Sequence, residues 1–209
     1  MKISSVTALA LTFSMTGFYL SAQTAKMSSA GSGETKHLFL DVHRLTPGIK
    51  PEAVAQAHQK DLAVEGTYGV DFIKYWVAQD EGLVFCLAEA SDSEALRKTH
   101  AEAHGLLPNN IYLVEGGTDA ELKGKKNLFL DIHYLGAGKV SVKDVAAAHE
   151  KDLAVEKKYG ANFINYWLNE KEGVVMCLVE AKDSSALINT HKEAHGLLPD
   201  KIYRVTQGQ

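Results

Sequence analysis

Two histidines spaced four residues apart occur just before a glycine at two places in this chain. The segments are THAEAHGLLP, with His100 and His104, and THKEAHGLLP, with His191 and His195. On a helix, residues at i and i+4 share one face, so both imidazoles of a pair can bind one transition-metal ion. The same pair can instead stabilise the end of a helix, where an imidazole meets unpaired carbonyl groups. The spacing alone does not choose between these interpretations.

Both histidine pairs belong to a longer tandem duplication. HLFLDVHRL matches NLFLDIHYL, AHQKDLAVEGTYGVDFIKYW matches AHEKDLAVEKKYGANFINYW, and GLVFCLAEASDSEALRKTHAEAHGLLP matches GVVMCLVEAKDSSALINTHKEAHGLLP. The copies differ in length by one residue, near Pro47 and Ala137. We place the repeats at 37–116 and 127–206, with a polar linker at 117–126. Repeats of this size are small for independent cores, so we expect them to pack together.

Each repeat carries the signals of strand, helix, two strands, helix and strand. In the first repeat, Pro51 suits the first turn of a helix, and QDEG between DFIKYWVA and LVFCLAEA indicates a hairpin. Ser91 and Glu94 have the spacing of a capping box, and Gly105 is placed to end the second helix. This order predicts an α+β protein of two tandem ferredoxin-like (βαββαβ) repeats, packed as a pseudo-twofold pair.

Both helices turn ionisable residues toward the expected sheet. His58, Asp61 and Glu65 fall in the middle of the first helix's apolar arc, which comprises Val54, Ala57, Leu62, Val64 and Tyr68. In the second helix His100 lies within the inward arc and His104 on its flank, and the arc comprises Leu96, Thr99, Ala103 and Leu107. Buried ionisable groups are costly unless they are paired or bound to metal, so these side chains should meet one another.

The strands supply further polar partners. In LFLDVH, Asp41 and His43 share one face with Phe39, while Leu38, Leu40 and Val42 share the other. If the Asp41 face meets the helices, it converges with the helical histidines, and Cys86 lies on the adjacent third strand. The candidate ligands are Asp41, His43, His58, Asp61, Cys86, His100 and His104 in the first repeat, and Asp131, His133, His149, Asp152, Cys177, His191 and His195 in the second. Such donors suit nickel, zinc, copper or iron better than calcium or magnesium.

Structural interpretations of the same residues stand beside the metal site. Cys86 also fits a small buried core position. Tyr75 and Trp76 fit packing in the core or between the repeats, and, as a second interpretation, stacking against a ligand. His58 and Asp61 also fit a buried histidine–carboxylate pair that holds no metal. The two cysteines, Cys86 and Cys177, occupy equivalent places in the two copies, so two separate thiols are expected rather than a disulfide.

The N-terminal residues have the pattern of an export signal. A lysine at position 2 precedes the apolar run VTALALTFSMTGFYL, and the small residues SAQTA follow it. We predict a signal peptide at 1–24, cleaved near Ala22 to Ala25, then a linker at 25–36 and a periplasmic or secreted protein. The net charge of -4 and the lack of a basic stripe exclude a nucleic-acid partner, and no membrane attachment is expected after cleavage.

The motifs AHxKDL, YW, FCL and HxxAHG occur in this order in both copies. In this combination the chain resembles a bacterial family of uncharacterised domains described as nickel-binding, with a ferredoxin-like fold. The resemblance covers nearly all of each repeat. It implies dimer-like pairing, here within one chain, and a transition-metal ion as ligand, with nickel first and zinc or copper next. It implies no enzymatic activity and no specific ligand set.

The function predicted first is that of an exported transition-metal-binding protein with one His/Asp/Cys site per repeat. The second is a small-molecule enzyme that uses a His–Asp pair in a cavity between the repeats. The third is a metal-free structural or interaction module. No phosphate loop, cofactor fingerprint or nucleophile constellation supports the enzyme, whose activity the sequence leaves undecided, and association into a homo-oligomer is left open.

Overall fold

The computed structural model describes residues 35–124 and 126–209, so the predicted signal peptide lies outside the described residues. The first repeat contains β1 (His37–Arg44), α1 (Pro51–Tyr68), β2 (Asp71–Ala78), β3 (Leu83–Ala90), α2 (Ser93–Ala103), β4 (Asn110–Leu113) and β5 (Glu115–Gly116). The second contains β6 (Asn127–Tyr134), α3 (Val142–Tyr159), β7 (Asn162–Asn169), β8 (Val174–Ala181), α4 (Ser184–Ala194) and β9 (Lys201–Gly208). Both repeats therefore have the predicted element order, with the last strand of the first divided in two. None of the described helices is long and apolar enough to cross a membrane.

The nine strands form one antiparallel sheet in the order β4-β1-β3-β2-β9-β6-β8-β7-β5. The last strand of each repeat serves both repeats. β9 pairs with β6 through Lys201–Val205 and with β2 through Thr206–Gly208. Similarly, β4 pairs with β1, and β5 pairs with β7 after a single buried residue, Val114. β4 and β5, the two ends of the strand order, are therefore consecutive in the chain and joined through Val114.

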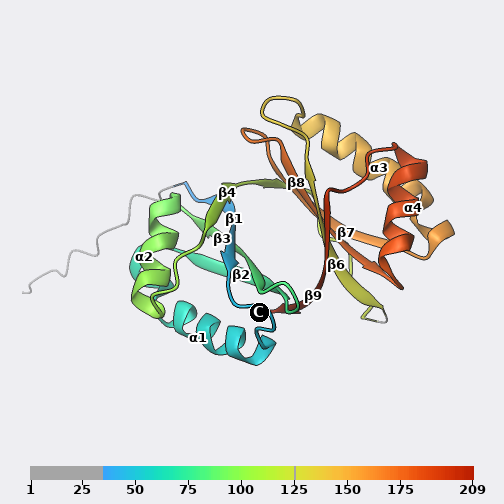
Figure 1. Ribbon diagram of the computed structural model, residues 1–209. Helices are drawn as coiled ribbons and strands as arrows, with labels where there is room; N and C mark the ends of the chain where they lie inside the picture. Colours follow the sequence, from blue (N-terminus) through green and yellow to red (C-terminus); the bar gives the residue numbers. More distant parts are fainter. Residues whose placement is uncertain (1–34, 125) are drawn as a thin grey trace, which may run out of the picture. The chain divides into compact units, whose positions relative to one another are not determined.

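The helices lie on the outer face of the strands. Figure 1 shows α1 and α2 together against one face of β1 to β3, and α3 and α4 against the matching face of β6 to β8. The opposite face carries the residues predicted from strand parity, including Leu40 and Val42. This resolves the ambiguity left by the sequence, because the Asp41 face is the one that meets the helices.

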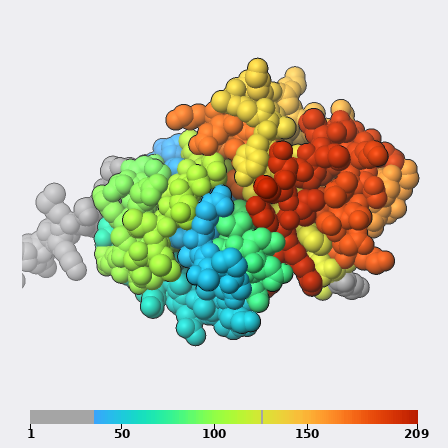
Figure 2. Space-filling view, in the orientation of Figure 1, coloured from blue at the N-terminus to red at the C-terminus, as the bar shows by residue number. Residues whose placement is uncertain are grey.

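The apolar core that joins the repeats draws on both copies. It contains Leu40, Val42, Trp76 and Phe85 from the first repeat and Leu130, Ile132, Trp167 and Met176 from the second, among others. The rings of Trp76 and Trp167 lie 4.9 Å apart between centroids, and both are buried. In Figure 2 the C-terminal segment lies against the first repeat, as the pairing of β9 with β2 requires. Trp76 is therefore a packing residue, as one of the two interpretations of the sequence expected.

Two details of the second helix differ from the sequence prediction. The predicted capping box of Ser91 and Glu94 is wrong, because Asp92 is the N-cap and its side chain accepts a 2.9 Å hydrogen bond from the backbone N–H of Ala95. An ionised carboxylate at this position also interacts favourably with the helix dipole. Leu107 does not face inward, because α2 ends at Ala103 and Leu107 is 52% exposed. Gly105 follows the helix with φ of 78°, a left-handed conformation that glycine adopts without strain.

The segment between the repeats runs along the second repeat. The backbone N–H of Gly117 donates to the carbonyl of Tyr166, and that of Ala120 donates to the carbonyl of Ile164. The carboxylate of Asp119 accepts a 2.6 Å hydrogen bond from Lys74 of the first repeat and a second hydrogen bond from Asn165 of the second. This polar segment therefore ties the two copies together, in addition to joining them along the chain.

Candidate metal centre

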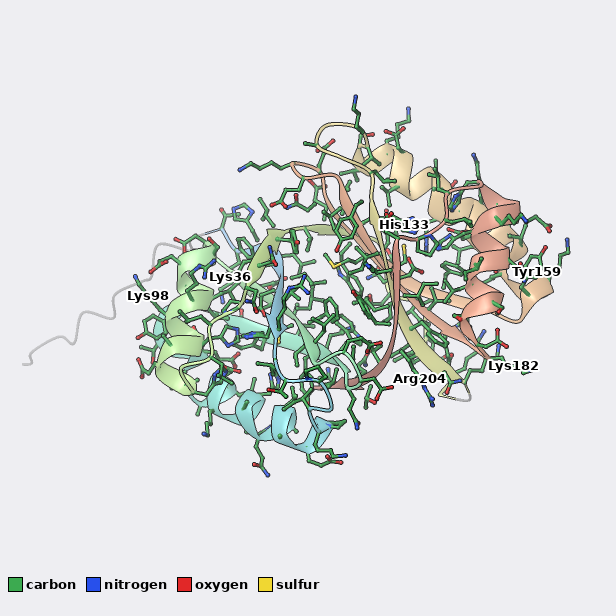
Figure 3. All side chains as sticks on the ribbon, viewed as in Figure 1. Lys36, Lys98, His133, Tyr159, Lys182 and Arg204 are labelled. Carbon is green, nitrogen blue, oxygen red and sulfur yellow. The ribbon has the colours of Figure 1, made fainter. Side chains whose placement is uncertain are left out.

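A polar row crosses the sheet beneath the helices of the first repeat. Asp41 on β1 pairs in register with Cys86 on β3, which pairs in register with Tyr75 on β2. Asp41 is fully buried, and His43, two residues further along the same face, is 5% exposed. The second repeat has the same row, formed by Asp131, Cys177 and Tyr166. Figure 3 shows His133, the counterpart of His43, on the side of β6 that faces α3 and α4.

The helices bring their ionisable residues onto this row. His100 of α2 lies between two carboxylates, with Nε2 3.1 Å from Asp41 Oδ2 and Nδ1 2.9 Å from Asp61 Oδ1. Asp61 comes from α1, so one imidazole ring connects the sheet and both helices. The second repeat repeats this arrangement, with His191 Nε2 3.3 Å from Asp131 and Nδ1 3.0 Å from Asp152. The predicted convergence of strand and helix residues is present in both copies.

The two carboxylates hold His100 in its charged form. Burial alone would lower the pKa of His100, but hydrogen bonds and charge from Asp41 and Asp61 raise it to about 9. Burial likewise opposes ionisation of Asp61, yet hydrogen bonds from His100 and His104 lower the pKa of Asp61 to about 2. The pKa of His191 is also raised to about 9 by Asp131 and Asp152, against the effect of burial. Each metal-free cluster is therefore an imidazolium between two carboxylates.

The backbone fixes the tautomer of His104. Its Nδ1 accepts a 3.1 Å hydrogen bond from the backbone N–H of Leu106, so Nδ1 carries no proton. The proton of the neutral ring then sits on Nε2, which lies 3.2 Å from one oxygen of Asp61 and 3.3 Å from the other. His195 is held in the same way by the N–H of Leu197 and by Asp152. The backbone just after each helix thus determines the tautomer of the second histidine of the pair.

The cysteines are buried and form no disulfide. Burial, followed by the charges of Asp41 and Asp61, raises the pKa of the Cys86 thiol well above its usual value. The same causes, with Asp131 and Asp152, apply to Cys177. Without a metal both side chains are therefore neutral thiols.

Two of the predicted residues, His58 and His149, stand apart from this network. Nδ1 of each is buried and has no hydrogen-bond partner among the described residues. Burial lowers the pKa of His58 and that of His149, so both rings are neutral. The His58 ring packs 4.7 Å from that of Tyr75, between centroids, and does not pair with Asp61. The metal-free His58–Asp61 pair considered from the sequence is therefore not formed, because His100 and His104 occupy the carboxylate.

Each repeat encloses a cavity between its helices and its sheet. The first, of about 190 Å³, is lined by His58, Asp61, Tyr75 and Cys86 among others, and the second, of about 90 Å³, by their counterparts. In the part of the chain that the structure describes, three spaces are lined by both repeats, of about 20, 220 and 280 Å³, and none of the candidate ligands lines any of them. The predicted position of a His–Asp cavity between the repeats is therefore wrong, because large apolar side chains such as Trp76 and Trp167 fill that interface.

The remaining candidate residues form groups that could hold a metal ion. In the second repeat Asp131, His133, Cys177 and His191 each offer a donor atom within 4.8 Å of all the others. In the first repeat the corresponding group is Asp41, His43 and His100, and Cys86, the counterpart of Cys177, does not join it. A second group in each copy joins the helix carboxylate to the histidine pair: Asp61, His100 and His104, or Asp152, His191 and His195. Within the described residues, His58 and His149 join no such group.

Sequence reasoning missed two contributors to the site. Tyr75 lines the cavity on the helix side of the sheet, and the alternation of β2 could have separated it from Trp76 on the other side. The backbone N–H of Leu106, which orients His104, left no signal in the sequence, because a main-chain donor is present at almost every residue.

Each of the two repeats matches the same family of known proteins. The family model described as "Nickel responsive protein SCO4226-like" matches residues 39–114 and 129–205, which is more than half of the chain. SCO4226 from Streptomyces coelicolor A3(2) is 39% identical over 36% of this chain and 91% of its own, with a TM-score of 0.35. An anthrone oxidase-like protein also aligns, with 12% identity over 84% of this chain and 94% of its own and a TM-score of 0.45. A putative monooxygenase from Lactobacillus acidophilus NCFM aligns with 9% identity over 83% of this chain and 94% of its own and a TM-score of 0.44. No curated protein matches the chain. The resemblance noted in the sequence is confirmed: the chain belongs to the family of nickel-responsive proteins that resemble SCO4226.

Proposed function

We propose that this protein binds a transition-metal ion at one buried site per repeat, with nickel as the first candidate. The observation that carries the proposal is the group formed by Asp131, His133, Cys177 and His191, whose donor atoms lie within 4.8 Å of one another. Imidazole, carboxylate and thiolate are together the donors that first-row transition metals prefer. The family supports nickel as the first candidate.

The ligands belong to the sheet side of each cluster. His100 can offer Nε2 to a metal shared with Asp41 and His43, or Nδ1 to a metal shared with Asp61 and His104. The second choice is unfavourable, because Nδ1 of His104 already accepts the Leu106 N–H and a metal would displace the only ring proton. The first choice leaves His100 Nδ1–H free to donate to Asp61, the arrangement typical of histidine ligands.

The candidates in the first repeat fall into three kinds: ligands, residues that orient a ligand, and His58. Asp41, His43, His100 and Cys86 are proposed as ligands. Asp61 and His104 orient the His100 ring, and His58 has another role. In the second repeat the ligands are Asp131, His133, His191 and Cys177, oriented by Asp152 and His195.

An unsatisfied oxygen fits the same ligand set. Oδ1 of Asp41 is buried and lies 3.1 Å from His43 Nε2, but it has no partner that meets strict hydrogen-bond geometry. Those two atoms are close but not aligned for hydrogen bonding with each other. Two ligand atoms that bind the same metal ion would have this arrangement. Asp131 Oδ1, 3.2 Å from His133 Nε2, is in the same position. A buried carboxylate oxygen without a partner is costly, and a cation between it and the imidazole would satisfy both.

We extend the proposal to architecture and location. Each repeat is proposed to be a ferredoxin-like unit, and the two to form a pseudo-twofold pair. The shared apolar core and the matching strand orders β4-β1-β3-β2 and β9-β6-β8-β7 support this. The protein is proposed to be exported, on the basis of the N-terminal sequence pattern.

The experiment compares two histidines of the same strand. His43 is buried in the cluster, whereas His37, at the start of β1, is exposed and has Asn127 as its counterpart in the second repeat. Nickel, zinc and copper are titrated by calorimetry into untagged, chelator-treated protein, its His43→Asn/His133→Asn variant and its His37→Asn variant. We expect two ions per chain in the wild type, a loss of at least tenfold in affinity in the double variant, and no change in His37→Asn.

Two results would contradict the proposal. The wild type could bind none of the three metals, in which case the clusters are metal-free polar networks. Alternatively, His37→Asn could weaken binding as much as His43→Asn/His133→Asn, which would place the ion at the surface.

A further inference from the structure

We propose that the cavity of the first repeat binds a small, neutral aromatic molecule with one hydroxyl group, a ligand of the phenol class. The site adjoins the proposed metal site, since His43, Cys86 and His100 also line this cavity, but it has its own stoichiometry. It consists of the space under α1 that is lined by Ala53, Val54, His58, Tyr75, Val84 and Leu106, among others.

The size of the cavity suits a single ring. Its volume is about 190 Å³, and an apolar cavity of roughly 150 Å³ is known to accept benzene. Half of its lining residues are aliphatic, and the ring of Tyr75 offers an aromatic face or edge for packing. Leu106 also lines the cavity and is 49% exposed, so the space reaches the surface beside this residue. A bound ring would cover part of this exposed leucine.

His58 is the reason for proposing a single polar group on the ligand. Its imidazole lines the cavity and is only 4% exposed, and its buried Nδ1 has no hydrogen-bond partner among the described residues. A neutral imidazole offers one donor and one acceptor, and a hydroxyl group can serve either of them. A ligand without a polar atom would leave the ring unsatisfied.

Charge decides against an ionised ligand. The carboxylate of Asp61 lines the cavity, and His100 and His104 already lie within hydrogen-bond distance of its two oxygens. An ionised ligand would therefore lose its water inside the cavity without gaining a free partner of opposite charge. A neutral hydroxyl avoids this cost.

The second repeat provides a natural contrast. Its cavity measures about 90 Å³, and its lining differs at two positions, where Val140 replaces Ile49 and Asp144 replaces Ala53. Asp144 belongs to the capping box at the start of α3, where Ser141 donates to its carboxylate, so a fixed carboxylate lines the second cavity. We therefore expect one aromatic ligand per chain, in contrast to the two metal ions per chain of the proposed function.

The test uses phenol as the probe with the metal-free, untagged full chain. Binding is followed by calorimetry and by ligand-observed NMR, and toluene, cyclohexanol and benzoate are compared with phenol. We expect saturable binding of one phenol per chain, with each of the other three at least tenfold weaker. His58→Leu should weaken phenol binding about tenfold through the lost hydrogen bond, and His149→Leu, the matched change in the second repeat, should have no effect.

A second variant does not depend on a change in the buried ring. Ala53→Asp places the carboxylate of the second repeat at an exposed position of α1 and should also weaken phenol binding about tenfold. Absence of saturable phenol binding would overturn the proposal, as would equal affinity for toluene or unchanged affinity in both His58→Leu and Ala53→Asp. Loss of phenol binding in His149→Leu would overturn the assignment to the first repeat. Metal titrations of the same samples report separately on the proposed metal sites, since their expected stoichiometry is two.

Discussion

Nδ1 of His100 lies 2.9 Å from Oδ1 of Asp61, and this contact joins two helices through residues that are 39 positions apart in the sequence. The contact has two roles. In the metal-free protein it stabilises the charged imidazole, and in a metal-bound protein it would fix the ring with Nε2 directed at the ion. The same pair recurs as His191 and Asp152 at 3.0 Å.

Replacing the orienting carboxylates should weaken metal binding while leaving the proposed ligands in place. We expect Asp61→Asn/Asp152→Asn to reduce nickel affinity about 10–100-fold, because each histidine ligand exchanges a charged, acceptor-only carboxylate for a neutral amide that can also donate. Calorimetric titration measures the change. Asp80→Asn, an exposed position in the hairpin loop, is the matched control and should bind as the wild type does. Equal affinities in the three proteins would show that these carboxylates do not support the site.

The metal-free protein should lose stability as the pH rises above neutrality. The pKa of His100 and that of His191 are about 9 in the folded state, against about 6.5 in an unfolded chain. The charged imidazole therefore contributes its full stabilisation below about pH 6.5. This contribution, roughly 3 kcal/mol of unfolding free energy per repeat, is lost as the pH rises through 9. Urea unfolding between pH 6 and 10 in the presence of a chelator measures it. A free energy of unfolding that stays constant over this interval in the wild type, or falls equally in His100→Gln/His191→Gln, would contradict the assignment.

Metal affinity should change with pH in the opposite direction. Binding to Nε2 of His100 requires the loss of a proton from a group with a pKa of about 9, so affinity should increase up to that pH. An unperturbed histidine would complete this change near 6.5. Competition titrations with a chelator of known affinity, from pH 6 to 9, measure the dependence. A plateau above pH 7 would mean that His100 is not a ligand.

The two repeats should unfold together. Trp76 and Trp167 are buried against each other in the core that both copies share, so Trp76→Ala should destabilise the whole protein by about 3–5 kcal/mol. Leu153→Ala, a large-to-small change at a position that is 41% exposed, should cost much less. Calorimetric scans should show one transition in all three proteins. Two separate transitions in the wild type would contradict the shared core.

The N-terminal sequence predicts a processed protein. We expect the mature chain to begin between Gln23 and Lys26 and to occur outside the cytoplasm, because a short positive start precedes an apolar run and small residues. N-terminal sequencing of the protein from its native source measures this directly. A cytoplasmic protein that retains Met1 would contradict the prediction.

The sequence alone determined the features that depend on local periodicity. The duplication fixed two equivalent sets of residues, and the alternation in LFLDVH separated Asp41 and His43 from Leu40 and Val42. Helical periodicity also placed His58, Asp61 and His100 on buried faces, since the position of a side chain around a helix or across a strand follows from its number. These positions hold in the structure because backbone geometry is the same wherever the element is packed.

Only the tertiary structure decided how those residues share their hydrogen bonds. Asp61 could have paired with His58, three residues earlier on the same helix, but the packing of α2 against α1 gives it to His100 and His104. The tautomer of His104 depends on one backbone N–H beyond the helix, that of Leu106. These outcomes rest on distances of about 3 Å between segments far apart in the chain, where a hydrogen bond forms or fails over a few tenths of an ångström. Residue type and spacing do not encode that precision, so the separation of ligands, orienting residues and the free His58 became visible only once the elements were packed.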